Sequence, residues 1–190
     1  MSEVTALYDS CVLYPAPLRD LLVHLGASGL VHAKWTQRIH DEWMDALLIN
    51  RPDLSRDRLL RTRDLMDRAV LNCLVEGYEP LAASLVLPDP NDCHVLAAAV
   101  HCGADAIVTL NLKHFPQVAL VPYGIEALHP DDFLIELMDV DLERVCIAAR
   151  KQRLNLKNPP KSVAEFLAGL TAQGLHQSVA RLQSRADLLE

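Results

Sequence analysis

The sequence has no long apolar run. Its hydrophobic stretches stay below the roughly 18 residues that a membrane-spanning helix needs, so we expect no membrane span. The N-terminal segment MSEVTALYDS places no basic region ahead of its apolar residues, and a secretory signal peptide is therefore not expected. These absences predict a cytoplasmic protein.

Paired cysteines are also missing. The five cysteines form no CxxC motif, and an odd, scattered set in a chain of this size is typical of reduced thiols in a protein core. This pattern argues against a structural zinc site. The eight histidines are dispersed too. His94 and His101 lie two turns apart on one predicted helix, but no third ligand stands near them, so we assign the histidines to core or surface positions.

Positive charge is scarce over the whole chain. Eighteen Lys and Arg against 25 Asp and Glu give a net charge of −7, which does not indicate a nucleic-acid-binding protein. Residues 144–161 differ, because this segment contains basic residues and no acid. Two interpretations stay open, a solvated helix face or a patch that contacts phosphates. In the second, the candidate substrate contacts are Arg150, Lys151 and Arg153, flanked by Arg144, Lys157 and Lys161.

The chain does contain an alternation of strand-like and helix-like segments. At 190 residues, of which 51% are apolar, it can form one ample core, and it has no internal repeat or low-complexity tract. Helical patterns separate four short β-prone segments, which are VTALYDS, LVHA, ADAIVTLN and ALVPYGIEALH. Strands that alternate with helices form βαβ units. The predicted fold class is therefore α/β, with a parallel sheet covered by helices on both faces.

The last quarter of the chain shows helical patterns only. After about Asp139 these are DLERVCIAARKQRL, SVAEFLAGLTAQ and LHQSVARLQS, with the linker-like NLKNPPK behind the first. We therefore predict a main domain over residues 1–138 and a small helical extension over residues 139–190. A further helix start is expected near Asp131, after the last strand.

An acidic turn precedes an alanine-rich helix in the segment LPDPNDCHVLAAA. Asp89, followed by a proline, is typical of a helix N-cap with proline at the first helical position. Asp92 lies three and four residues before Val95 and Leu96, so it continues the apolar stripe of the helix. Capping alone explains both acids, yet a carboxylate in line with a core face is also typical of a functional site.

Four polar side chains are expected at one edge of the sheet. Asp9 ends the first predicted strand, Asn111 ends a later one, and Asp92 opens the helix before that later strand. The carboxyl ends of parallel strands and the adjacent helix starts lie together. Glu42 lies three residues after Ile39, so it borders the buried face of its own helix.

Several carboxylates in one place cost free energy through desolvation and repulsion unless protons or a cation neutralise them. Carboxylate and amide oxygens suit Mg²⁺ or Mn²⁺, so we predict a divalent-metal site that lowers the pKa of a bound water and stabilises charge on a phosphodiester. Each side chain also has a structural alternative. Asp9 would cap a turn, Glu42 would pair with Arg38, and Asn111 would be a turn residue.

The segments YDSCVL, IHDEW and LPDPNDCHVLAAAVHCGADAIVTLNLKHF, in this order, resemble the PIN-domain ribonucleases, in particular the toxins of VapBC-type toxin–antitoxin pairs. The third segment is the most specific, because it combines the acid, the alanine-rich helix, the strand and a TxNxxxF ending. The resemblance covers Val4 to Leu137, and the helical tail is similar to C-terminal extensions in one branch of the family. It implies a three-layer α/β/α sandwich with a central parallel sheet, in which residues 1–138 form the nuclease domain.

The resemblance also implies metal-dependent cleavage of single-stranded RNA. Asp9, Glu42 and Asp92 match the acidic metal site of the family, and Asp89 matches an additional acid often found just before it. Asn111 stands where many members have a fourth acid. Its amide can coordinate or orient a bound water, but it removes a negative charge, so the choice between one metal and two stays open.

Substrate and partner contacts follow from the same resemblance. Ser10 and Thr109 are candidate hydroxyl contacts to substrate, with strand packing as the alternative. The expected macromolecular partners are RNA, a cognate antitoxin that can insert an Arg into the carboxylate site, and a second copy of the chain in a homodimer.

Two other functions fit similar residues. A Mg²⁺-dependent phosphatase or a flap-type DNA nuclease would use comparable carboxylates, although Cys11 stands where an aspartyl-phosphate phosphatase would have the second acid of its DxD motif. The other alternative is a catalytically degenerate domain that binds a protein or RNA.

Overall fold

The computed structural model describes residues 4–190. All strands of its sheet run parallel, in the order β2-β1-β3-β4, so β1 and β3 are central. The strands are β1 (Val4–Tyr8), β2 (Val31–Lys34), β3 (Ala106–Val108) and β4 (Glu126–Leu128). The predicted α/β class with a parallel sheet is confirmed.

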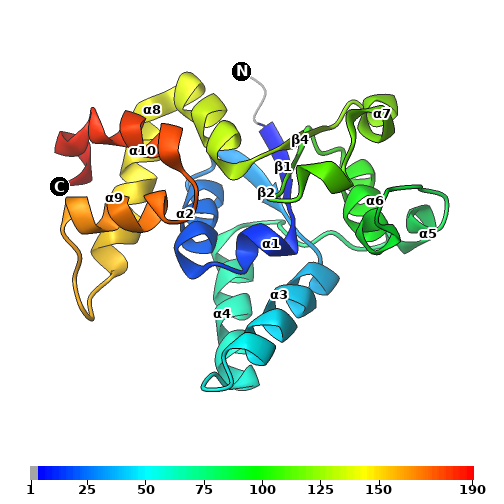
Figure 1. Ribbon diagram of the computed structural model, residues 1–190, viewed down its shortest axis with the longest axis horizontal. Helices are drawn as coiled ribbons and strands as arrows, with labels where there is room; N and C mark the ends of the chain where they lie inside the picture. The colour runs from blue at the N-terminus through cyan, green and yellow to red at the C-terminus, as the bar shows by residue number, and fades with distance from the viewer. Residues whose placement is uncertain (1–3) are drawn as a thin grey trace.

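Helices cover both faces of this sheet. On one side, α2 (Ala16–Ala27) packs against β2 and against α8 (Pro130–Asn155). On the other side, α6 (Cys93–Cys102) packs on β1 and β3, and α5 (Glu79–Ala82) lies against it (Figure 1). The remaining helices of the main domain are α1 (Ser10–Leu13), α3 (Gln37–Asn50), α4 (Arg56–Ala69) and α7 (Gln117–Leu120). The predicted α/β/α sandwich is thus confirmed.

The alanine-rich helix α6 lies deep in the core. Its residues 93–99 are all buried, because small side chains let a helix approach a sheet closely. The helix ends at Gly103, whose left-handed backbone (φ 63°) is the conformation that glycine adopts without steric cost. At its start, the 3₁₀ turn η1 (Pro90–Asp92) is capped by Asp89, which accepts a 2.9 Å hydrogen bond from the Asn91 amide. The predicted cap is therefore confirmed.

Two segments differ from the sequence prediction. The run ADAIVTLN forms a strand only over Ala106–Val108, because β1 pairs Tyr8 with Val108 and then turns into α1, and on the β4 side the backbone contact ends with the Thr109 amide, which donates to the Leu128 carbonyl at 3.0 Å. The segment predicted as loop before Asp89 contains the short helix α5. Strand β4 is preceded by α7 and by the 3₁₀ turn η3 (Val121–Tyr123).

The C-terminal helices pack on the main domain through α8. Its chain continues into α9 (Val163–Thr171), α10 (His176–Gln183) and the 3₁₀ turn η4 (Ala186–Leu189), with α10 and η4 against α8. The backbone of α8 departs from helical geometry at Asp141 (φ −157°, ψ 85°). The predicted boundary between residues 138 and 139 falls inside α8, just before this kink, and stays a prediction.

The expected helix start near Asp131 is confirmed, because α8 begins at Pro130, but Asp131 is not the residue that caps it. The N-cap of α8 is His129, whose Nδ1 accepts a hydrogen bond from the Asp131 amide at 3.1 Å. The Asp131 carboxylate instead accepts from the backbone amides of Gln177 and Ser178 at 2.9 and 2.8 Å, and from the Ser178 hydroxyl. An acid of α8 therefore caps α10, a long-range contact that a local pattern does not reveal.

Over residues 4–190, no helix is both long enough and apolar enough to cross a membrane. The cytoplasmic location stays a prediction.

Candidate active site

Asp9 lies at the carboxyl end of central strand β1 and is buried, with 4% of its surface exposed. Its Oδ1 accepts a 2.6 Å hydrogen bond from the Ser10 amide, so the residue caps α1 as its structural alternative predicts. Its Oδ2 accepts from the Thr109 hydroxyl at 2.7 Å and from the Cys11 thiol at 3.1 Å. These donors hold the carboxylate in one orientation.

A second acidic group lies at the start of α6. The Asp92 carboxylate is 2.7 Å from Nδ1 of His114, which belongs to the 3₁₀ turn η2 (Leu112–His114). One ligand atom each from Asp89, Asp92 and His114 can be chosen so that all three lie within 4.8 Å of one another. This spacing fits a single cation, with two carboxylate oxygens and an imidazole nitrogen as ligands.

The pKa of the Asp92 carboxyl depends on its burial and on the charged groups around it. Burial raises the pKa of the Asp92 carboxyl, the hydrogen bond from His114 opposes that rise, and the negative charges of Asp9 and Asp89 add to it. The net effect is a raised pKa. Asp9 and Asp89 are therefore each close enough to repel the Asp92 carboxylate, and a divalent cation would relieve this repulsion. Two carboxylates and an imidazole are ligands that a divalent cation accepts, but of the predicted ligands Asp9, Glu42 and Asp92 this three-residue cluster contains Asp92 alone, so the roles of Asp9 and Glu42 as metal ligands stay predictions.

Glu42 of α3 lies opposite and has cationic partners of its own. Its Oε1 is 2.8 Å from Nε2 of His94 and accepts a 3.2 Å hydrogen bond from Nε of Arg38, so the predicted ion pair with Arg38 is confirmed. Burial works against ionisation of Glu42, but hydrogen bonds and charge from His94 and then Arg38 outweigh it and lower the pKa. Glu42 is thus held as a carboxylate without a metal.

A pocket of about 360 Å³ joins Glu42 to the α1 side of the site. It is lined by Ser10 and Cys11, the two residues that follow Asp9, and by Leu110, two residues after the end of β3. The remaining lining residues are Tyr14, Pro15, Glu42, Trp43 and Ala46. The pocket therefore reaches from Glu42 to the two residues that follow Asp9.

The other predicted site residues of the main domain differ in how far they are exposed to solvent. Thr109 is fully buried, and its hydroxyl is engaged with Asp9 and with the Asn111 amide, which donates to it at 3.0 Å. Ser10 is half-buried and lines the pocket. Asn111 is exposed at the start of η2. The roles of all three in substrate or metal contact stay predictions.

The basic segment lies on the C-terminal part of α8, away from the acids. The Arg153 guanidinium donates to the carbonyls of Leu189, Lys161 and Glu190 at 2.9, 3.1 and 2.8 Å, so it fastens the end of the chain to α8. Arg150 and Lys151 are exposed. Among the described contacts, none joins these three residues to the acidic site, and their role as substrate contacts stays a prediction.

Sequence reasoning missed three residues of the site. His94 and His114 were assigned to core or surface positions, but each contacts a predicted acid, and Cys11 was treated only as a core thiol although it donates to Asp9. The available signal was proximity in sequence, since His94 and Cys11 each lie two residues from a predicted acid and His114 three residues from Asn111.

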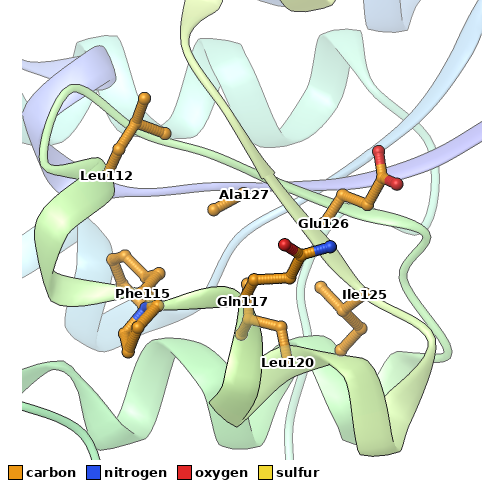
Figure 2. A pocket seen from close by; sticks show the side chains of 8 residues that line it. Leu112, Phe115, Gln117, Leu120, Ile125, Glu126 and Ala127 are labelled. Carbon is orange, nitrogen blue, oxygen red and sulfur yellow. The ribbon is translucent and has the colours of Figure 1, made fainter.

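A separate pocket of about 290 Å³ lies beside edge strand β4. Figure 2 shows Gln117 and Leu120 of α7 facing Ile125, Glu126 and Ala127. Leu112 and Phe115 close its other side. None of the predicted site residues lines this pocket.

The described fold and the acids at its sheet edge agree with the comparison with known families. A family model described as "PIN domain" matches residues 5–113, more than half of the chain. The chain belongs to the PIN domain family. A second model, described as "VapC50 C-terminal domain", matches residues 130–184, which include all of α8, α9 and α10.

One curated protein also resembles this PIN domain protein. It is named "Putative ribonuclease VapC50", comes from Mycobacterium tuberculosis (strain ATCC 25618 / H37Rv), and is 56% identical over 64 residues. The aligned segment is 34% of this chain and 37% of that protein, so the match spans little more than a third of either. No solved structure matches the chain.

Proposed function

We propose that this PIN domain protein is a divalent-metal-dependent endoribonuclease that hydrolyses RNA phosphodiesters. The observation that carries the proposal is the group of acids at this end of the sheet, where Asp89, Asp92 and His114 place ligand atoms within 4.8 Å of one another, and where burial first and the charges of Asp9 and Asp89 next raise the pKa of Asp92. Such mutual repulsion destabilises a fold unless a cation or a proton balances it. The family match and the name of the curated relative support a nuclease over other metal enzymes.

The residues have separate roles in this proposal. Asp9, Asp89, Asp92 and His114 supply the ligand atoms, with Asn111 near enough in sequence to add an amide oxygen. Mg²⁺ is favoured by the carboxylates, and Mn²⁺ accepts the imidazole more readily. A bound cation would activate water and offset negative charge on the phosphodiester. The Thr109 hydroxyl and the Ser10 amide keep Asp9 in place.

Glu42 completes the set from the other side of the pocket. Its Oε1 is engaged by His94 and Arg38, so the carboxylate is fixed and charged before any ligand arrives. We assign it as a metal ligand or as a group that orients the attacking water, and Ser10 as a contact to the substrate.

The biological role proposed is that of the toxin in a toxin–antitoxin pair, acting in the cytoplasm. The name of the curated relative and the match to the VapC50 C-terminal domain support this assignment. The partner would be an antitoxin that places an Arg among the carboxylates, because a guanidinium pairs with two carboxylate oxygens at once. A homodimer is proposed on the same resemblance.

Cleavage assays on purified protein test the proposal. A mixed RNA pool, single-stranded and flap DNA, and a small phosphoester are incubated with Mg²⁺ or Mn²⁺, using the wild type, Asp9→Ala and Asp45→Asn. Asp45 is the control because it is an exposed acid of α3 that pairs with Arg56. We expect RNA cleavage by the wild type and Asp45→Asn, and its loss in Asp9→Ala.

Other results would replace the proposal. Cleavage of DNA or of the small phosphoester in preference to RNA indicates the neighbouring enzyme classes. No cleavage and no metal affinity in a folded wild type indicates a binding module.

A further inference from the structure

The pocket beside Glu42 continues into a second, larger cavity. This cavity measures about 570 Å³ and shares Tyr14 and Pro15 with the first. It lies between the α1–α2 turn, the facing parts of α3 and α4, and Gln173 of the C-terminal extension. We call it the arginine basin, after Arg19, Arg51 and Arg58; its other lining residues are Ala16, Pro17, Leu47, Leu54, Leu59, Thr62 and Gln173.

The charge of the arginine basin is opposite to that of the acidic site. Three arginines line it, and no acidic residue lines it among residues 4–190. Arg51 is paired with Asp53 at 2.7 and 2.8 Å, and the charge of the exposed Arg58 also acts on Asp53, so this acid balances part of the positive charge. Arg58 makes no side-chain hydrogen bond within residues 4–190, which leaves its donors open to a ligand. In a chain of net charge −7, this concentration of cations beside a metal site is a local feature that attracts anions.

Arg19 adds a buried positive charge at the wall of the basin. Only 7% of it is exposed, its Nη1 donates to the Leu13 carbonyl at 2.9 Å, and its guanidinium lies 4.7 Å from the centre of the Trp43 ring. Its Nε has no hydrogen-bond partner within the described chain, the nearest carboxylate being that of Asp20 at 3.8 Å. Arg19 thus fixes the α1–α2 turn, which carries Tyr14, and leaves part of its charge uncompensated.

Tyr14 lies where the two cavities meet. It is half-buried and lines both, one cavity containing Glu42 and the other the three arginines. Single-stranded RNA offers unstacked bases and a phosphate on every nucleotide, and proteins bind it with aromatic rings beside cationic grooves. Here the two adjoining cavities share the aromatic Tyr14, and one of them is lined by three arginines.

We propose that the arginine basin is the subsite for the phosphates of single-stranded RNA next to the scissile bond, with a base stacked on Tyr14 and a phosphate held by Arg58 and Arg51. This inference rests on the proposed ribonuclease function. In this inference, the side chains that contact the phosphates nearest the cleavage site come from the α3–α4 region. They do not come from the basic segment of α8, which was the candidate from the sequence. The extension contributes Gln173 to the wall, so it helps to shape the substrate path.

Binding and cleavage measured on matched variants test the subsite. The probe is a fluorescent 2′-O-methyl oligoribonucleotide of about 12 nucleotides, which resists cleavage, and its anisotropy gives Kd at several salt concentrations. The variants are Arg58→Gln and Tyr14→Leu. The control is Arg56→Gln, which removes the same charge from the same helix but lies outside the basin and pairs with Asp45.

We expect Arg58→Gln to raise Kd about five- to tenfold and to lower the slope of log Kd against log salt by about 0.7, the value for one lost phosphate contact on a single strand. Tyr14→Leu should raise Kd by a similar factor with an unchanged slope, because stacking involves no counterion release. KM for unmodified RNA should rise in both variants. Arg56→Gln should stay within about twofold of the wild type.

Two results would overturn the inference. If the wild type cleaves RNA but Arg58→Gln and Arg56→Gln behave alike, the basin is not a phosphate subsite, while the proposed function stands. If the wild type neither binds nor cleaves RNA, both fail. The other possible ligand of the basin is an acidic protein segment, and a polyglutamate peptide tests it. The peptide is added at the concentration at which its carboxylates equal the phosphates of the oligonucleotide. If it displaces the oligonucleotide from the wild type, the basin is assigned to an acidic protein segment and the RNA subsite is contradicted.

Discussion

Nε2 of His94 lies 2.8 Å from Oε1 of Glu42, and this contact joins the start of α6 to the middle of α3 across the candidate site. His94 is 3% exposed, and its Nδ1 has no hydrogen-bond partner within residues 4–190. The imidazole is therefore held mainly by Glu42 and by packing, and in turn it fixes the direction of the Glu42 carboxylate. Residues that orient an active-site carboxylate in this way affect activity without touching the substrate.

His94→Asn should lower RNA cleavage by about ten- to a hundredfold, since the shorter amide cannot reach Glu42. His94→Gln should recover most of that loss, because its terminal amide nitrogen takes the approximate place of Nε2 and still donates to Oε1. Initial rates under saturating metal give the comparison, and thermal unfolding shows whether both variants fold. Equal rates in the two variants would show that the His94 contact with Glu42 does not matter for activity.

Asp131→Ala should destabilise the C-terminal helices by about 1–2 kcal/mol, because α10 loses the cap for its first amides. Proteolysis should then cut first near the linker between α8 and α9. The matched control is Asp132→Ala, the adjacent exposed acid, whose bond is to the Gln177 side chain. Identical protease sensitivity of the two variants would contradict the capping role.

The same carboxylate predicts a pH dependence. Burial of Asp131 opposes ionisation, but hydrogen bonds from the Ser178 side chain and from the Ser178 and Gln177 amides outweigh it and lower the pKa. A carboxyl whose folded-state pKa is depressed stabilises the fold above its unfolded pKa of about 4 and loses that contribution as the pH falls through the folded value. The stability difference between wild type and Asp131→Asn should therefore be constant at neutral pH and shrink in acid.

Cys11 should react slowly with alkylating reagents. Burial and the negative charge of Asp9 raise the pKa of the thiol to about 12, so almost no thiolate exists at pH 8. Mass spectrometry after brief iodoacetamide treatment should find Cys11 unmodified, and labelling should increase in Asp9→Asn, which removes that charge. Rapid labelling of Cys11 in the wild type would contradict the buried, hydrogen-bonded position.

The parallel sheet, and the placing of Asp9 and Asp92 at the same edge of it, could be predicted from the sequence. The carboxyl ends of parallel strands meet at one edge, and β1 and β3 are neighbours there. The prediction used only where strands end and helices begin, which local patterns indicate, together with the parallel arrangement of the strands. The cap at Asp89 was predictable on the same basis.

Contacts that depend on where helices cross could not be predicted. His94 meets Glu42 only because α3 and α6 approach each other, and Asp131 caps α10 across 46 residues of sequence. His114 turns toward Asp92 because a 3₁₀ turn follows the end of β3. The arginine basin likewise combines Arg58 with Gln173, which no spacing rule connects.

Titration of the wild type and Asp92→Asn with Mg²⁺ and Mn²⁺, following Tm and RNA cleavage in the same samples, tests the central claim most directly. Without metal, Asp92→Asn should be the more stable protein at neutral pH, because burial and neighbouring acids disfavour the Asp92 charge. With metal at a hundred times its Kd, the wild type should gain about 2.7 kcal/mol and cleave RNA, while the variant gains little and is inactive. Equal metal responses and equal cleavage in the two proteins would contradict the assignment of Asp92 as a metal ligand.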